Sequence, residues 1–246
     1  MGAIHSYAGS KAGEGWLWSQ RWLDLLFVHW RVPVDSLRPH VPLGLEIDTY
    51  DGTSWVSAVA FRLARVRRRR LPPVWPVSAF PELNLRTYVR HGSEPGICFL
   101  SIHAGRWLAT CLARHFTGLP YVYAPIRYRR REDGYRFDCP GPEFAAEWTA
   151  AGPAAEVSPD SIDAWLLERY ALYVEDRRGG ILRTEVDHRP WIVHRVRSTV
   201  RASGLGSPFG LSLGAEPDAT HFSDGVRARI WPFASADARK PVSLTY

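Results

Sequence analysis

The first strongly apolar run of the chain extends from Trp22 to Val32 and reads WLDLLFVHWRV. It is rich in aromatic and β-branched residues and Pro33 follows it directly, so we expect a buried strand that ends there. A second run, from Leu45 to Phe61, places Asp51-Gly52 between two apolar stretches. Asp-Gly in this position is typical of a tight turn, which predicts a hairpin of two strands.

Apolar and polar side chains alternate over residues 81–89. On the two-residue period of a strand, one face carries Leu83, Leu85, Thr87 and Val89. The opposite face carries Glu82, Asn84, Arg86 and Tyr88. The segment therefore predicts a strand with one apolar and one polar face.

Helical spacing of apolar residues follows in RWLATCLARHF, residues 106–116, and Gly118-Leu119-Pro120 ends that pattern. A strand is expected over residues 121–128. Ser158 has the features of an N-cap, with proline after it and acidic residues in the first turn, which predicts a second helix over residues 159–168.

The chain has 246 residues, 46% of them apolar, and no repeat or change of composition divides it. Residues 1–15 are rich in Gly, Ala and Ser, so we expect a flexible leader there and a single domain over residues 16–246. Three cysteines without a CxxC pair are typical of a reducing compartment. Without a signal peptide or a stretch of membrane-spanning length, the sequence predicts a cytoplasmic protein that does not enter a membrane.

The net charge is +6, and the basic residues are almost all arginine, with lysine only at Lys11 and Lys240. A basic balance attracts nucleic acid and acidic ligands over long range. The runs RVRRRR at residues 65–70 and YRRRED at residues 128–133 lack interleaved stacking aromatics, so a solvated surface is the favoured interpretation. Nucleic acid binding through Arg65 to Arg70 is kept as the weakest hypothesis.

The nine histidines form no HExxH, HxH or Cys/His cluster at ligand spacing. His29 lies inside an apolar strand, as core histidines do, and His188 in HRPW is expected to fix a turn. The glycines of SGLGSPFG, residues 203–210, do not match GxGxxG. The sequence therefore predicts neither a metal site nor a cofactor.

The polar face of residues 82–88 allows two interpretations. If the strand closes a barrel, the face points inward and lines a cavity, because such groups are costly to bury without partners or a ligand. Otherwise the face meets solvent, or Glu82 and Arg86 form a structural ion pair. The residues alone slightly favour this second interpretation. His103 and Arg106 follow the strand ICFLSIH and are expected at its mouth, although Arg106 equally suits a surface position at a helix start.

Further motifs are spread from about Trp16 to Pro232. They are LLFVHWRVP, LRPHVPLGLEIDTYDGTSWV, ELNLRTYV, FLSIHAGRWLATCLAR, LPY, HRPW and HFSDGVRARIWP. Together they resemble the YqjF-like family of uncharacterised conserved proteins. That family is similar in fold to acetoacetate decarboxylase. The resemblance implies a β-rich α+β fold, an antiparallel sheet closed into a cone-shaped barrel with a ligand cavity inside and a few flanking helices.

The resemblance also implies a site. In acetoacetate decarboxylase a glutamate and an arginine support a lysine, which follows a Gly-Phe-Pro turn and condenses with the substrate ketone. Here Glu82 matches the glutamate and Gly118-Leu119-Pro120 matches the turn, so Tyr121 stands where the lysine would be. Neither Lys11, in the expected leader, nor Lys240, in the tail, has surroundings that would activate an amine.

With the resemblance, the cavity becomes the favoured interpretation of the polar face. Glu82 and Tyr121 are then the candidate catalytic groups, because a buried carboxyl can move a proton and a phenol can hydrogen-bond an enolate oxygen. The candidate substrate-binding residues are Arg86, Asn84, Tyr88, His103 and Arg106.

Two functions follow from these residues. The first is an enzyme of the decarboxylase-like fold that acts on an enolisable carbonyl or carboxylate substrate without a Schiff-base lysine. The second is a non-catalytic ligand-binding or sensor protein that kept the cavity. Both predict a small organic, anionic ligand as partner; catalysis itself and assembly into a homo-oligomer stay open.

Overall fold

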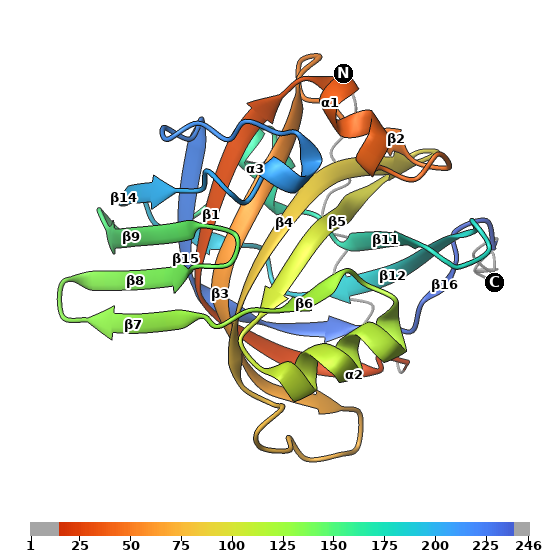
Figure 1. Ribbon diagram of the computed structural model, residues 1–246, viewed down its shortest axis with the longest axis horizontal. Coiled ribbons are helices and arrows are strands. Elements are labelled where there is room, and N and C mark those ends of the chain that lie inside the picture. The colour runs from red at the N-terminus through yellow and green to blue at the C-terminus, as the bar shows by residue number, and fades with distance from the viewer. Residues whose placement is uncertain (1–14, 239–246) are drawn as a thin grey trace, which may run out of the picture.

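The computed structural model describes residues 15–238, and strands dominate it (Figure 1). Within these residues the largest sheet has ten strands. They are β1 (Trp18–Val32), β2 (Glu46–Ile47), β3 (Ser54–Arg68), β4 (Phe80–His91), β5 (Glu94–Ala104), β6 (Tyr121–Tyr123), β11 (Ala171–Glu175), β12 (Ile181–Asp187), β15 (Ala219–Ile230) and β16 (Ala234–Ser235). Residues 1–14 of the expected leader and both lysines lie outside the described residues.

The large sheet closes on itself because β4 pairs with β3 on one side and with β5 on the other. The ring runs β4, β3, β1, β15, β12, β11, β5 and back to β4. It is mixed rather than wholly antiparallel, since β5 is parallel to both β6 and β11. The closure gives every strand of the ring an inner and an outer face.

A smaller sheet covers the outer face of β1, β3 and β4 (Figure 1). Its strands are β7 (Arg127–Arg131), β8 (Gly134–Cys139), β9 (Phe144–Ala150) and β14 (Val196–Arg201). Apolar residues of both sheets share one core, and they include Leu26, Val28, Val56, Leu83, Leu85, Phe137, Trp148 and Val200. The apolar face of β4 therefore packs between the two sheets.

The inner face of the ring has its own apolar cluster, which includes Phe27, Trp55, Val59, Phe61, Ile102, Leu166 and Trp191. Helix α3 (Ile162–Leu167) contributes to this cluster, so it packs against the inner face. The remaining elements are α1 (Val34–Leu37), η1 (Arg38–His40), α2 (Trp107–Thr117), β10 (Ala155–Glu156), β13 (Ile192–Val193) and η2 (Ser207–Phe209). No helix among residues 15–238 is both long and apolar enough to cross a lipid bilayer.

The expected elements are largely present. Pro33 follows β1, and α2 ends at Gly118, whose φ of 68° is the left-handed conformation that glycine adopts at helix ends. The strand expected over residues 121–128 is two strands, because Pro125 interrupts it between β6 and β7. Asp51-Gly52 forms a tight turn that is closed by an antiparallel bridge between Tyr50 and Thr53, as the hairpin prediction requires. The prediction is wrong beyond that bridge, because the short β2 pairs with β4 and not with β3.

Helix α3 begins later than the sequence predicts. Its N-cap is Ser161, whose side-chain oxygen accepts a hydrogen bond of 3.1 Å from the backbone nitrogen of Ala164. Ser158 instead accepts, through its carbonyl oxygen, hydrogen bonds from the backbone nitrogen and the hydroxyl of Ser161. The helix thus begins one turn later than Ser158-Pro159 indicates.

Candidate functional site

Four polar side chains of β4 belong to the inner face of the ring, as the alternation of the sequence predicts. Glu82 pairs with Phe61 on β3 and with Ala104 on β5, and both neighbours belong to the inner apolar cluster. Glu82 is 4% exposed and Asn84 is 5% exposed. The interpretation that this face meets solvent is therefore wrong.

Glu82 is a buried carboxyl group that has no basic partner among residues 15–238. Its Oε1 accepts a long hydrogen bond of 3.4 Å from Nδ2 of Asn84, and its Oε2 accepts one of 3.5 Å from the hydroxyl of Tyr121. Burial dominates these bonds and raises the pKa of Glu82 to about 7. Burial, with the adjacent Glu82, raises the pKa of Tyr121 well above its ordinary value, so the phenol stays a hydrogen-bond donor.

Arg86 lies further along the same face and is half-buried. Its Nη2 donates a long hydrogen bond of 3.4 Å to the carbonyl oxygen of Leu166, and its guanidinium carbon lies 5.7 Å from the centre of the Phe27 ring. Neither contact neutralises its charge. Arg86 and Glu82 form no ion pair in the described part of the chain, so the interpretation of this pair as structural is wrong.

Two buried polar atoms of this face, Oδ1 of Asn84 and Nε of Arg86, have no hydrogen-bond partner among the described residues. Leaving a buried polar group unsatisfied costs about 1–3 kcal/mol, and more for a charged one. One free acceptor and one free cationic donor on the same face are therefore suited to hold a polar, anionic molecule.

A chain of hydrogen bonds, which the sequence analysis does not predict, begins beside Arg86. The hydroxyl of Tyr88 donates to the carbonyl oxygen of Leu166 at 2.9 Å and lies 2.5 Å from Oγ of Ser57. Ser57 Oγ is 2.5 Å from Nδ1 of His29, and Nε2 of His29 is 3.2 Å from Nδ1 of His221. The chain ends at Asp163, whose Oδ1 is 3.0 Å from Nε2 of His221.

The carbonyl oxygen at the inner end sets the direction of these hydrogen bonds. A carbonyl oxygen only accepts, so Tyr88 must donate to Leu166. Ser57 then donates to Tyr88, His29 donates through Nδ1 to Ser57, and His221 donates through Nδ1 to His29. The last contact, between Nε2 of His221 and Oδ1 of Asp163, holds one proton, which we assign to the imidazole so that Asp163 is a carboxylate. The hydrogen bond to His221 lowers the pKa of Asp163, in agreement with that assignment.

The chain joins the interior to the surface. The side chain of Asp163 is 46% exposed, whereas Tyr88, Ser57 and His29 are fully buried. Burial, then His221 and Arg86, lowers the pKa of His29 well below its ordinary value, so His29 is neutral at physiological pH. The positive charge of the chain is thus held at its outer end.

His188 lies near Arg86 and is neutral as well. Burial, followed by the charge of Arg86, lowers the pKa of His188 to about 4, and its Nδ1 donates a hydrogen bond of 2.7 Å to the carbonyl oxygen of Arg189. Its ring packs against Trp191 with 4.7 Å between ring centres. The structure assigns no turn to residues 188–191, so the turn-fixing role of His188 stays a prediction.

The structure brings Glu82, Asn84 and Tyr121 together, and Arg86 and Tyr88 donate to the same carbonyl oxygen, that of Leu166. It does not bring His103 or Arg106 to them, so that part of the expectation is wrong. His103 pairs with Leu83 and therefore lies on the outer face, and Arg106 is the exposed N-cap residue of α2. Among the described residues, no group of three or more His, Cys, Asp or Glu side chains is placed to hold a metal ion.

Comparison with known proteins adds a family to this geometry. A model of the DUF2071 family, described as an uncharacterized conserved protein, matches residues 19–227. The chain belongs to the DUF2071 family. Another protein similar to this chain is the uncharacterized protein YqjF of Bacillus subtilis (strain 168), which is 35% identical over 222 residues, or 88% of this chain and 91% of YqjF.

Solved structures similar to this DUF2071 protein agree on the fold. The enduracididine biosynthesis enzyme MppR, in complex with pyruvate, has a TM-score of 0.62 at 14% identity and is covered over 93% of each chain. An acetoacetate decarboxylase-like enzyme from Sphingomonas wittichii RW1 has a TM-score of 0.60 at 16% identity, over 94% of this chain and 96% of that enzyme. The decarboxylase-like fold expected from the resemblance is confirmed.

Proposed function

We propose that this DUF2071 protein binds a small carbonyl or carboxylate compound inside the ring and moves a proton on it through Glu82, without forming an imine. The observation that carries the proposal is the buried carboxyl of Glu82, whose pKa of about 7 is that of a base at physiological pH. Lysine is absent from the described residues, so an imine would need a lysine from outside them.

The other groups of the inner face would hold the ligand. A guanidinium binds a carboxylate with two parallel hydrogen bonds, and Arg86 is half-buried with one donor unsatisfied. The Cα atoms of residues 82 and 86 are about 13 Å apart along an extended strand. The carboxyl and guanidinium groups can lie closer together than that, because both side chains are long. The ligand would therefore carry its anionic group a few bonds from the carbon that Glu82 deprotonates.

The proposed step is enolisation. The Glu82 carboxylate takes a proton from the carbon next to the ligand carbonyl. The electron pair of that C–H bond forms the C=C bond of the enolate, and the π pair of the C=O bond moves to the oxygen. The Tyr121 hydroxyl donates a hydrogen bond to the resulting enolate, as it donates to Glu82 in the free protein. Return of the proton restores the ligand, and in D₂O a deuteron returns in its place.

The test is hydrogen exchange of pyruvate, 2-oxobutyrate and 2-oxoglutarate in D₂O, followed by proton NMR. Pyruvate is included because a structurally similar enzyme binds it. We expect the natural chain to accelerate exchange for at least one of the acids, and Glu82→Gln to slow it by at least about 100-fold. Glu46→Gln, which changes an exposed glutamate of β2, is the matched control and should exchange like the natural chain.

Two results would contradict the proposal. If the exchange rate is unchanged in Glu82→Gln, Glu82 is not the base. If borohydride inactivates the protein only when the keto acid is present, the reaction passes through an imine. A non-catalytic binder is the second candidate, favoured by the unsatisfied atoms of Asn84 and Arg86, which suit binding without any chemistry. It predicts that a keto acid raises the melting temperature while no exchange occurs.

A further inference from the structure

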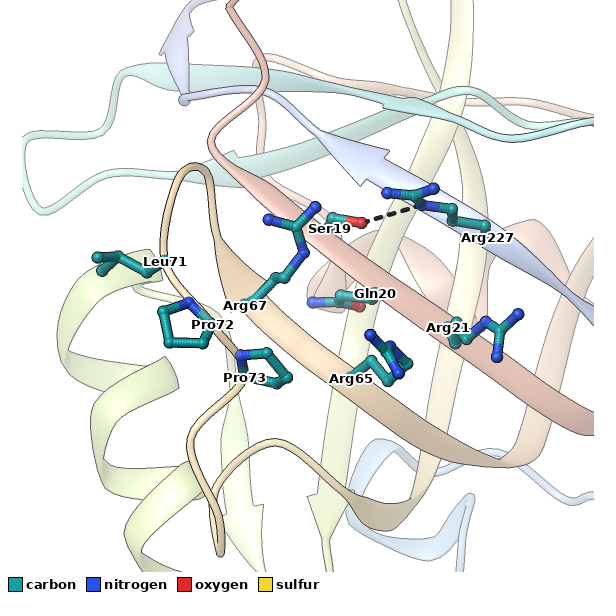
Figure 2. Close-up of a pocket in the computed structure, with 9 residues that line it drawn as sticks. All are labelled: Ser19, Gln20, Arg21, Arg65, Arg67, Leu71, Pro72, Pro73 and Arg227. Atoms are coloured by element: carbon teal, nitrogen blue, oxygen red, sulfur yellow. Dashed lines mark hydrogen bonds between the residues drawn. The ribbon is translucent and has the colours of Figure 1, made fainter.

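A hollow lies on the outer side of the ring, away from Glu82. It has a volume of about 470 Å³ and opens where β1, β3 and β15 run side by side (Figure 2). Its lining is strongly basic and consists of Ser19, Gln20, Arg21, Arg65, Arg67, Leu71, Pro72, Pro73 and Arg227.

Strand register explains why arginines from three strands meet there. Ser19 of β1 pairs with Arg67 of β3, and Arg21 of β1 pairs with Arg227 of β15. Paired residues of neighbouring strands point to the same face, so these arginines surround Ser19, which is 3% exposed and forms part of the floor.

A bulge in β3 adds the fourth arginine. The pairing shifts by one residue between Ser19 and Arg21, so that two residues of β3 lie opposite Gln20. Arg65 is one of them and has a φ of 52°, the left-handed conformation that occurs in one class of bulge. Figure 2 shows its side chain on the same side of the sheet as Arg67.

The hollow is lined by four arginines and by no acidic side chain. None of these four arginines forms an ion pair in the described part of the chain. Arg227 donates a long hydrogen bond of 3.4 Å to Ser19 Oγ, and the guanidinium of Arg67 lies 5.4 Å from the centre of the Trp16 ring. Like charges placed opposite each other on a sheet are destabilising, and a bound anion would remove that repulsion.

The remaining wall of the hollow is apolar. It is formed by Leu71, Pro72 and Pro73 of the loop after β3, which Figure 2 shows beside the arginines. Volumes of 300–1,000 Å³ are typical of small-molecule sites. A ligand that fits this lining carries several negative charges at one end and an apolar body at the other.

We propose that this hollow binds a small organic phosphate with at least two anionic charges, such as a nucleoside diphosphate. Guanidinium groups bind phosphate oxygens in pairs of parallel hydrogen bonds, and the proline wall offers a surface to the organic part. Of the RVRRRR run only Arg65 and Arg67 line the hollow, and their partners come from β1 and β15. The charge is therefore gathered at one point and not spread along a line, which favours a small ligand over a nucleic acid.

The experiment measures binding of ADP and of inorganic pyrophosphate to the full chain by calorimetry at physiological ionic strength. The test variant is Arg21→Gln with Arg227→Gln, and the control is Arg127→Gln with Arg129→Gln, which removes the same charge from exposed positions of β7. We expect ADP to bind more tightly than pyrophosphate. The test variant should lose at least about tenfold in affinity and the control less than twofold.

A second readout does not depend on binding. Without any anion, the test variant should melt at a higher temperature than the natural chain, because half of the unpaired charge is gone; the control should melt as the natural chain does.

Three results would overturn the proposal: no binding of either compound, an equal loss in both double variants, or tighter binding of single-stranded DNA than of ADP with the same loss in the test variant. Tighter binding of single-stranded DNA would show that the hollow is a nucleic acid site. If neither ADP nor pyrophosphate binds but anionic lipid vesicles do, the ligand is a membrane headgroup.

Discussion

Glu82 gives this protein a pH-dependent stability that a single substitution should remove. In the unfolded chain a glutamate titrates near pH 4.5, whereas burial raises the pKa of Glu82 to about 7 in the folded protein. Between these values the unfolded state has lost the proton and the folded state keeps it. Folded protein therefore binds more protons, and the free energy of unfolding falls as the pH rises.

The size of the effect follows from the shift. A difference of about 2.5 pH units corresponds to about 3 kcal/mol, which is absent below pH 4.5 and fully developed above pH 7. Asn84 and Tyr121 contact different oxygens of Glu82. Glu82→Gln keeps the shape of the side chain and offers one acceptor oxygen and one donor group, as the protonated carboxyl does. The variant should therefore be more stable than the natural chain by about 3 kcal/mol at pH 8 and equal to it at pH 4.

Urea unfolding of both proteins at intervals from pH 4 to pH 8.5 measures this difference. Taking the difference between the two proteins cancels every other titrating group. Glu46→Gln serves as the control, because Glu46 is exposed, and its difference from the natural chain should not change with pH. A stability difference for Glu82→Gln that stays constant over the whole range would refute the burial argument.

Three further outcomes are expected. Ser57→Ala leaves the groups on both sides of it without their partner, so it should cost about 1–3 kcal/mol in urea unfolding, whereas Ser212→Ala, at an exposed position, should cost almost nothing. Asp163→Asn should lower stability at neutral pH, and the loss should disappear as the pH falls through the lowered pKa of Asp163, below its ordinary value of 3.8. In the native protein a thiol reagent at pH 8 should label only the exposed Cys111, since burial raises the pKa of both other thiols to about 12; labelling before unfolding would contradict the buried positions of Cys98 and Cys139.

The polar face of β4 could be predicted because it depends only on alternation within one strand. Side chains of residues 82–88 point alternately to the two faces of one continuous strand. The sequence alone therefore identifies the four residues of the polar face, although not what surrounds them. The same holds for α2, whose apolar spacing and final Gly118 are local signals. The pairing of Tyr121 with Glu82 came from the resemblance, since nothing in the sequence between them indicates a contact.

The hydrogen-bond chain could not be predicted in this way, because its members come from four strands and a helix. His29 looked like an ordinary core histidine, and its contact with His221 depends on the pairing of β1 with β15, almost two hundred residues apart. The error over His103 has the same origin. Its face is set by pairing with Leu83 across β4 and β5, and no local pattern contains that register.

The position of β15 has a consequence for how the protein is made. This strand fills the gap between β1 and β12, and it leaves the ribosome almost two hundred residues after β1. Until then β1 can pair with β3 but keeps its other edge open along most of its length. Open edges of long strands invite pairing with other chains, so the nascent protein passes through a stage at which aggregation competes with completion. A chain cut before residue 219 would stay at that stage.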